Sequence, residues 1–372
     1  MNKHLRILFV TRKYPPSVGG MQRLSYQLIR HLRSHVEVQA ITWGGSQVWL
    51  PWFLLHALVQ GWRHARRVDI LHAGDPLVAP VVALLAARYR KPAVVNVHGL
   101  DLTFDFPGYQ VLMPRLLRRF ARVVCISQMT YEEALHYGLA PERCRIIHPG
   151  VEVPSAVPTY DAARAYIAVR FGVPLAWRQV WLTVGRLVPR KGVVWFCDEV
   201  LPRLQAAADA VYLVVGDGPE ERRLRTVIAT RGLAGRVVLL GRVSDTDLMQ
   251  IYAASDLFIM PNIPQPHDRE GFGLVAIEAA AHGLPVLAAR LDGIQDAVIV
   301  GESGYLLPAQ DAEAWAAFLQ RCLTSPNLSK ELRPRAPQAV WERFKWDEIA
   351  ARYVALFREV LDEAEQERNR RR

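Results

Sequence analysis

The fold class is decided by the stretch VWLTVGRLVPRKG, residues 180–192. Its first five residues form the apolar run of a buried strand, and the glycine-containing turn that follows leads into a helix beginning at Gly192. Arg186 carries a planar guanidinium and Lys191 a point charge, and both would lie beside the start of that helix. This combination suits a diphosphate. A solvated basic turn explains the segment alone equally well.

The same rhythm extends along all 372 residues, because short β-branched runs alternate with longer segments of helical periodicity. That alternation is typical of βαβ units and parallel sheets, and the length fits two domains. We expect a domain over 1–153, a second over 154–345, and a C-terminal helix over 346–372 that packs back on the first. Strands are predicted over 5–10, 36–41, 68–71, 93–97, 122–126, 145–147, 180–184, 211–215, 237–240, 257–260 and 286–289. Helices are predicted over 22–33, 77–90, 109–120 and 129–137, and the end of the chain, 312–367, is predicted to be helical.

The charge of the chain is uneven. It has 46 basic and 36 acidic residues and a net charge of +10, and residues 1–155 hold 19 of the basic but only 9 of the acidic ones. A one-sided excess predicts that the first half meets an anionic partner. No aromatic RNA platform or recognition-helix motif accompanies the charge, so no nucleic-acid partner is expected.

The four cysteines are far apart and form no CxxC pair, which predicts reduced thiols rather than a disulfide framework or zinc site. The chain starts almost directly with a predicted strand, and its longest apolar runs fall short of the ~20 residues that a spanning helix needs. We therefore expect a cytoplasmic protein, either free or peripheral on the inner face of the membrane.

A second segment, REGFGLVAIEA at 269–279, places Glu270 and Glu278 on either side of a glycine turn. Gly271 and Gly273 allow close approach of the backbone to a ligand, and the helix beginning near Leu274 offers free N–H groups. Glu278 could accept both hydroxyls of a ribose, and Glu270 could hold sugar hydroxyls. Two exposed glutamates would be the alternative, but Glu278 has apolar neighbours among which an unpaired carboxylate would be costly.

Together the two segments resemble the retaining nucleotide-sugar glycosyltransferases of family 4, which have the GT-B fold. The resemblance covers nearly the whole chain, because further motifs occur in the family's order. These are Gly19-Gly20, HGLD at 98–101, IHPGVE at 147–152 and GDGPE at 216–220. It implies an α/β protein with two Rossmann-like domains facing across a cleft, and C-terminal helices.

The resemblance also implies roles for individual residues. Arg186 and Lys191 would neutralise the leaving nucleoside diphosphate, Glu270 would lie beside the transferred sugar, and Glu278 would bind the ribose. His98 would lie near the reacting face of the sugar, unless it is a satisfied core histidine. The other residues implied on the donor are Gly19, Gly20, Gly185, Gly271, Phe272, Gly273 and Leu274. Asp101 and Arg23 are candidates on the acceptor side.

The reaction implied is transfer of a hexose, with its anomeric configuration retained, to a hydroxyl of a lipid-linked or polysaccharide acceptor. The segment 186–191 and the long loop 261–269 resemble the mannosyl-transferring branch, which favours GDP-mannose. No cofactor and no essential metal are expected. The DxD spacing of Asp245 and Asp247 is better explained as the first turn of a helix with Ser244 as N-cap. The alternatives are a nucleotide-sugar epimerase on the same fold and an anionic-polymer-binding protein.

Two further patterns lie in the basic half. Arg115, Arg118, Arg119 and Arg122 have the spacing of one basic stripe on a helix. Four tryptophans occur within twenty positions, followed by the basic run 63–67. Aromatic residues with a basic flank suit the headgroup region of an anionic membrane, and a buried helix that packs its tryptophans on the sheet is the alternative. The tryptophans are Trp43, Trp49, Trp52 and Trp62.

Overall fold

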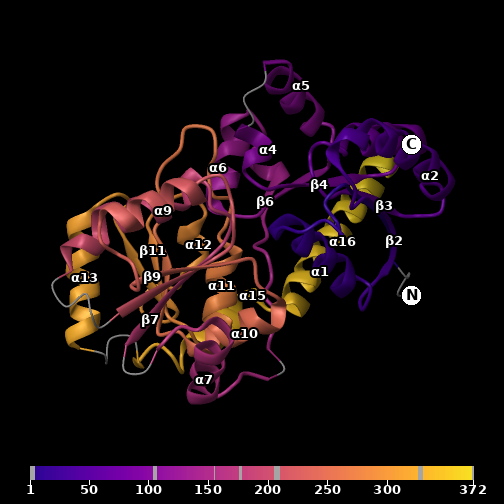
Figure 1. The fold of residues 1–372 in the computed structure, drawn as a ribbon. Coiled ribbons are helices and arrows are strands. Elements are labelled where there is room, and N and C mark those ends of the chain that lie inside the picture. Colours follow the sequence, from indigo (N-terminus) through magenta and orange to yellow (C-terminus); the bar gives the residue numbers. More distant parts are fainter. Residues whose placement is uncertain are drawn as a thin grey trace. The chain divides into compact units, whose positions relative to one another are not determined.

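The computed structural model describes residues 5–103, 107–154, 156–175, 178–204, 210–325 and 330–370. The chain divides into two compact units (Figure 1): unit 1 is Met1–Gly150 with Phe344–Arg372, and unit 2 is Val151–Arg343. The sequence placed the junctions after residues 153 and 345, and the contacts of the chain place them after Gly150 and Arg343. Each unit is built on a six-stranded sheet in which all pairs of strands are parallel.

The sheet of unit 1 has the strand order β2-β1-β3-β4-β5-β6. The chain adds β2 on one side of β1 and β3 to β6 on the other. The strand order therefore reverses between β1 and β3, and this is the topological switch point of the unit. Strands such as β4 are buried along their whole length, as expected where helices cover both faces. The strands are β1 (Arg6–Thr11), β2 (Glu37–Thr42), β3 (Ile70–Ala73), β4 (Ala93–Val97), β5 (Arg122–Cys125) and β6 (Cys144–Ile146).

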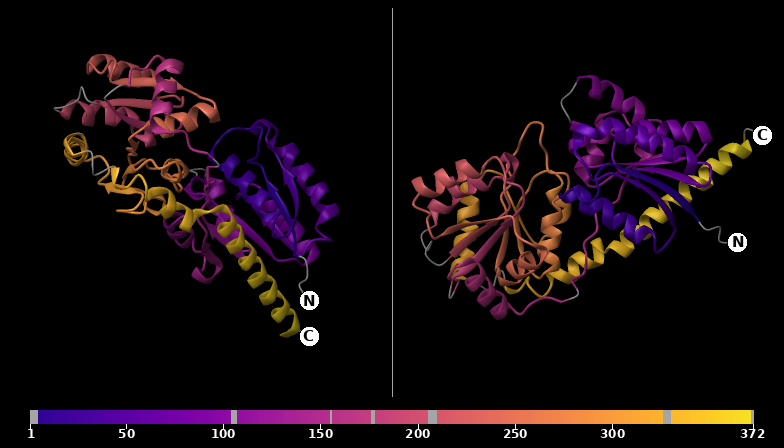
Figure 2. Two further views of the ribbon diagram at one scale, coloured as in Figure 1. Left: turned by 90° about the horizontal axis from the view of Figure 1, so that it is seen from below. Right: turned by 45° about the vertical axis from the view of Figure 1, so that its right-hand side comes forward.

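Helices cover the two faces of this sheet separately. One apolar core joins the sheet to α2, α3, α5 and α6, and a second joins it to α1 and α16. Figure 2 shows α16, in yellow, running along the sheet of unit 1. The helices are α1 (Gly20–Leu32), η1 (Gln47–Trp49), α2 (Leu50–His64), α3 (Ala79–Tyr89), α4 (Leu100–Thr103), α5 (Pro107–Leu117), α6 (Gln128–His136), η2 (Pro141–Arg143) and α16 (Trp346–Arg370).

The predicted basic stripe is wrong. Helix α5 ends at Leu117, and Arg122 is buried as the first residue of β5. Its Nη2 atom donates to Glu359 Oε1 at 2.7 Å and also to Glu363, both on α16. Arg122 therefore fastens the C-terminal helix to the sheet through two carboxylates of this chain.

Unit 2 has the strand order β12-β11-β10-β7-β8-β9, and its switch point lies between β7 and β10. The strands are β7 (Gln179–Val184), β8 (Ala210–Val215), β9 (Val237–Gly241), β10 (Leu257–Met260), β11 (Val286–Ala289) and β12 (Gly304–Leu307). The helices are α7 (Tyr160–Phe171), η3 (Pro189–Lys191), α8 (Val193–Trp195), η4 (Phe196–Val200, a π-helix), η5 (Leu201–Arg203), α9 (Glu221–Thr230), α10 (Asp245–Ala254), α11 (Leu274–Ala281), α12 (Ile294–Ala297), α13 (Ala312–Thr324) and α15 (Ala336–Phe344).

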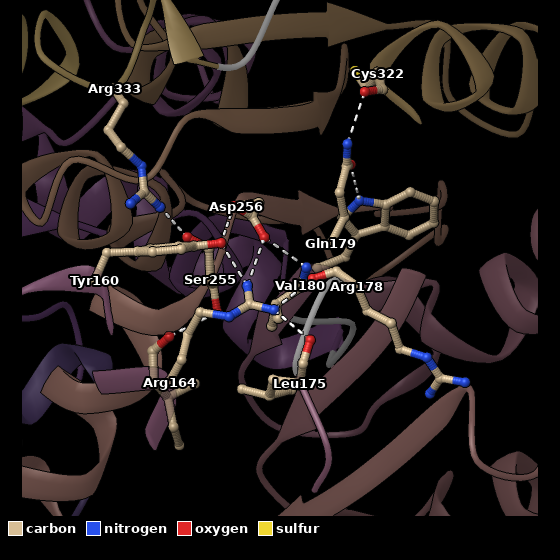
Figure 3. Close-up of polar contacts among 12 residues, drawn as sticks. Tyr160, Arg164, Leu175, Arg178, Gln179, Val180, Ser255, Asp256, Cys322 and Arg333 are labelled. Carbon is tan, nitrogen blue, oxygen red and sulfur yellow. Dashed lines mark hydrogen bonds and ion pairs between the residues drawn. The ribbon is translucent and has the colours of Figure 1, made fainter. Parts of the chain in front are cut away.

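A buried arginine joins α7 to the amino ends of the central strands of unit 2 (Figure 3). Arg164 Nη2 donates to the carbonyls of Leu175 and Arg178 at 2.5 and 2.6 Å, and Nη1 donates to Asp256 Oδ2 at 3.3 Å. Tyr160 donates its hydroxyl to Asp256 Oδ1 at 2.8 Å. The network fixes the end of the sheet opposite to the carboxyl ends of the strands.

The helix start predicted at Ser244 is confirmed. Ser244 Oγ accepts from the backbone N–H of Asp247 at 3.0 Å, and Asp245 and Asp247 lie in the first turn of α10. Asp247 also accepts from Tyr166 at 2.7 Å. Within the ranges that the structure describes, no group of three or more His, Cys, Asp or Glu side chains could hold a metal ion.

Several other elements differ from the prediction. Helix α7 and strand β12 were not predicted, and the helical end of the chain includes α13, α15 and α16. Helix α2 does form, but its tryptophans do not all pack on the sheet. Trp43 stacks on Phe53 with ring centroids 5.6 Å apart, whereas Trp49, Trp52 and Trp62 are more than half exposed.

Candidate active site

The loops that follow β7 and β10 meet at the switch point of unit 2. Gly192 has φ +67°, and a Cβ there would lie 1.8 Å from the carbonyl oxygen of Pro261. Only glycine permits this approach. The backbone N–H of Ile263 also donates to the carbonyl of Arg190 at 3.0 Å. Strand-end loops at a switch point are where α/β sheets bind ligands.

Lys191 and Glu270 are brought together by these two loops. Lys191 Nζ donates to Glu270 Oε2 at 2.6 Å, and the two side chains are only 10 and 13% exposed. Asn262 Nδ2 donates to the same oxygen at 3.2 Å, and Arg190 Nε lies 3.4 Å from it. The carboxylate is thus held by two hydrogen bonds and by the nearby charge of Arg190.

Burial by itself would raise the pKa of Glu270. The charges of Lys191 and Arg190, with the hydrogen bonds from Lys191 and Asn262, outweigh burial and leave the pKa below its ordinary value. Glu270 is therefore ionised at neutral pH and can accept hydrogen bonds from hydroxyl groups.

A second ring of contacts holds this centre, and the sequence analysis did not identify its members. Arg190 binds Asp268 at 3.1 Å, while Asp292 accepts from Arg269 Nε at 2.8 Å and from the backbone N–H of Glu270 at 3.1 Å. Asn262 could have been found, because it is a polar residue two positions after a buried strand. Asp292 offered no local signal, since its partners lie 22 and 23 residues away.

The other residues predicted to bind the nucleotide-sugar donor differ in exposure and in position relative to Lys191 and Glu270. Arg186 is exposed. A Cβ on Gly185 would lie 3.6 Å from Lys191 Cε, so Gly185 lies against that side chain. Gly273, with φ +96°, precedes α11, on which Leu274 is the first residue. Phe272 is buried at 2% exposure.

Glu278 lies one turn inside α11 and is half-buried. Its neighbours Ala276, Ile277 and Ala279 are buried, as the sequence pattern predicts.

Unit 1 has a charged pair at its own switch point, and neither member was predicted from the sequence. Arg12, after β1, lies with Nε 3.1 Å from Oδ1 of Asp75, after β3. Asp75 is fully buried and its Oδ1 also accepts from the backbone N–H of Leu77 at 3.0 Å. Its Oδ2 is buried and has no hydrogen-bond partner among the described residues.

His98, after β4, belongs to the same strand-end region. Its Nε2 lies 2.8 Å from the carbonyl oxygen of Gly74 and must carry the proton that it donates. In the neutral ring Nδ1 is then an acceptor, and it is buried with no partner in the part of the chain that the structure describes. The backbone N–H of His98 donates to Asp101 Oδ2 at 3.2 Å. His98 is therefore not a core histidine with both ring nitrogens hydrogen-bonded within the described chain.

Asp101 lies near His98 in an environment that raises its pKa, mainly through burial and secondarily through Asp75. Of the N-terminal glycines, Gly19 is the N-cap of α1 and Gly20 is its first residue. Arg23 is exposed in the first turn of that helix, and its N–H donates to the carbonyl of Gly19 at 3.1 Å.

The chain has two α/β units, and each has a parallel sheet with a cluster of polar residues at its switch point. This is the architecture of GT-B proteins. Sequence comparison identifies the family: residues 178–325 match the glycosyl transferases of group 1 and residues 18–153 match glycosyltransferase family 4. The chain belongs to this family of nucleotide-sugar glycosyltransferases. This assignment favours glycosyl transfer over the epimerase and the anionic-polymer-binding protein.

Individual relatives agree with the assignment. A D-inositol 3-phosphate glycosyltransferase of Acidothermus cellulolyticus is 33% identical over 79% of this chain and 68% of its own. A GDP-mannose-dependent alpha-(1-6)-phosphatidylinositol monomannoside mannosyltransferase of Mycolicibacterium smegmatis is 27% identical over 94% of this chain and 97% of its own.

Solved structures confirm the fold. Anabaena Alr3699/HepE, in complex with UDP and glucose, matches with a TM-score of 0.78 and 21% identity over 96% of this chain and 100% of that one. The sucrose-phosphate synthase of Thermosynechococcus elongatus gives a TM-score of 0.80 and 21% identity over 97% and 100%. The predicted GT-B fold is therefore confirmed.

Proposed function

We propose that unit 2 binds the nucleotide sugar at its switch point, with Arg186 and Lys191 on the diphosphate. Glu270 then holds the transferred hexose, and Glu278 the ribose. The observation that carries this proposal is the Lys191–Glu270 contact, in which a buried cation and anion from loops 79 positions apart converge where such sheets bind ligands. A buried ion pair is costly as a stabilising device alone, so its place at this edge favours a role in binding.

The backbone completes the donor site in this proposal. Gly185, Gly271 and Gly273 leave room for the ligand, and the free N–H groups at the start of α11 favour negative charge. Gly19 and Gly20, at the start of α1, form the corresponding helix start of unit 1 and are proposed phosphate-binding residues.

The proposed reaction retains the anomeric configuration. The acceptor hydroxyl attacks the anomeric carbon from the side on which the diphosphate leaves. As the bond to the diphosphate oxygen breaks, the diphosphate takes the proton of the hydroxyl. Arg186 and Lys191 stabilise the negative charge that develops on the leaving group. Since two cations already fill this role, we propose that the reaction needs no divalent metal.

We propose that unit 1 binds the acceptor. Asp75 Oδ2 and His98 Nδ1 are buried acceptors without partners among the described residues, and they follow the adjacent strands β3 and β4. Each can accept a hydrogen bond from a sugar hydroxyl. Asp101 and the exposed Arg23 are further acceptor-side residues in this proposal.

We propose GDP-mannose as donor and a lipid-linked or polysaccharide hydroxyl as acceptor, at the cytoplasmic face of the membrane. The support is the resemblance of residues 186–191 and 261–269 to the mannosyl-transferring branch, together with the relative named for GDP-mannose and phosphatidylinositol monomannoside.

A thermal-shift panel with GDP, UDP and ADP tests the donor. A ligand that binds only the folded state raises the melting temperature by mass action, so GDP should give the largest rise, and EDTA should not reduce it. A larger rise with UDP or ADP would contradict GDP-mannose but keep the diphosphate site. No rise with any of the three would contradict the site itself.

A further inference from the structure

One face of helix α2, together with the end of η1 before it, carries large apolar side chains that the fold of unit 1 leaves uncovered. We call this set the tryptophan face; its members are between 45 and 64% exposed. They are Trp49, Trp52, Leu55, Val59 and Trp62.

Helical geometry gathers these side chains into one stripe. From Trp52 to Trp62 the spacings are three, four and three residues, which places four of the five within about 80° around the axis and along about 15 Å of helix. The opposite side of α2 is buried in the core through Phe53 and Ala57, and Gly61 approaches Leu85 of α3. The packing of α2 therefore fixes the direction in which the stripe points.

Exposed apolar side chains also occur on the neighbouring helices. Helix α2 packs on α3, and α3 packs on α5. Leu84 on α3 and both Val111 and Leu112 on α5 are more than half exposed. Monomeric soluble proteins seldom expose large contiguous apolar surface without a partner for it.

The charges next to the tryptophan face have a single sign. Arg63 and Arg66 are exposed at the C-terminal end of α2, and Arg88 and Arg90 at that of α3. The two ends are joined, because Tyr89 donates its hydroxyl to the carbonyl of Trp62 at 2.9 Å. Residues 50–68 and 76–100 contain no acidic residue.

We propose that the tryptophan face and its arginines dock unit 1 on an anionic phospholipid bilayer. Tryptophan places its apolar ring and its N–H at the boundary between acyl chains and headgroups. Arginines at the same level attract anionic headgroups, and carboxylates that would repel them are missing from both stretches of sequence. No helix among the described residues meets the length and apolarity needed to span a bilayer, so α2 would lie in the plane of the interface. This docking does not depend on the proposed reaction.

Co-flotation tests the proposal with vesicles of phosphatidylcholine alone and of phosphatidylcholine with one third phosphatidylglycerol. The wild-type chain should float with the anionic vesicles, and brominated lipid should quench its tryptophan fluorescence. Trp52→Ser/Trp62→Ser should lower the partition coefficient at least about tenfold. Arg63→Glu/Arg66→Glu should lower it on the order of tenfold or more and weaken its dependence on salt.

Matched controls come from exposed positions elsewhere. Val169→Ser/Val300→Ser removes two exposed apolar side chains of unit 2, and Arg222→Glu/Arg352→Glu makes the same change of charge. Both controls should bind as the wild type does. Equal recovery with neutral and anionic vesicles would overturn the proposal. Tryptophan variants that bind lipid as the wild type does would also overturn it. This includes the case in which the variants are monomeric and the wild type is a dimer, because the tryptophan face would then be a self-association surface.

Discussion

Lys191 and Glu270 hold opposite charges 2.6 Å apart at the edge of the sheet where unit 2 would bind its donor. In this state each side chain satisfies the other, and Asn262 and Arg190 restrict Glu270 further. Preorganised charges of this kind require little rearrangement when a ligand arrives, which is how an enzyme stabilises developing charge efficiently. The pair links stability and proposed function in the same two residues.

The lowered pKa of Glu270 gives a prediction about stability and pH. Because the folded-state pKa lies below the ordinary value of about 4.3, the carboxylate stabilises the fold above that pH, and this contribution is lost as the pH falls through the folded-state pKa. Glu270→Gln should cost about 2 kcal/mol at neutral pH, or about 4–8 °C in melting temperature.

Thermal unfolding of both proteins between pH 8 and pH 3 measures this effect. The difference in melting temperature should stay constant down to about pH 5 and shrink below about pH 4, where the wild-type side chain also becomes neutral. A variant that is as stable as the wild type at pH 7 would contradict a stabilising role for the pair.

At the scale of elements, the attachment of α7 depends on one buried guanidinium. Arg164 serves two carbonyls and Asp256 at once. Arg164→Met would remove the hydrogen bonds from the guanidinium to both carbonyls and leave the partly buried carboxylate of Asp256 without its cation, so we expect a loss of about 3–5 kcal/mol in the free energy of unfolding. Chemical denaturation followed by circular dichroism measures it.

Arg225→Met is the matched control for this change. Arg225 is 63% exposed and forms an i,i+4 pair with Glu221 on α9, and such surface pairs contribute less than about 1 kcal/mol. Similar losses of unfolding free energy in Arg164→Met and Arg225→Met would contradict the claim that the attachment of α7 depends on Arg164.

Elements whose evidence is local could be predicted from the sequence. The strands β4, β10 and β11 lie where their apolar runs placed them, with identical bounds for all three. Lys191 and Glu270 were also identifiable, because each follows a buried strand and a motif that resembles one family. Their mutual contact was not, since it depends on two loops that meet only when β7 and β10 become neighbours.

The failures have long-range causes. Arg122 has the spacing of a helical stripe, yet its position is decided by carboxylates 237 and 241 residues away in the chain. Asp75 and Arg12 are 63 residues apart and carry no local motif. The exposure of the tryptophans depends on which side of α2 packs against α3, and the apolar run 48–60 does not reveal that side.

At the scale of the whole molecule, both units follow one plan. Each sheet reverses its strand order once, and each reversal carries an ion pair, Arg12–Asp75 in unit 1 and Lys191–Glu270 in unit 2. The chain returns to unit 1 at its end, so α16 belongs to the core of the unit with which the chain begins. This plan suits a reaction of two substrates, with the donor on unit 2 and the acceptor on unit 1.

Calorimetric titration of GDP into the wild-type chain and into Arg186→Ala/Lys191→Ala tests the central claim most directly. Because charge-assisted contacts to phosphate are strong, the double variant should bind GDP on the order of 100-fold more weakly. Arg222→Ala/Arg225→Ala, which removes two exposed cations of the same unit, should bind GDP as the wild type does. Equal GDP affinity in the wild type and the Arg186/Lys191 variant would contradict the claim that these two cations hold the diphosphate.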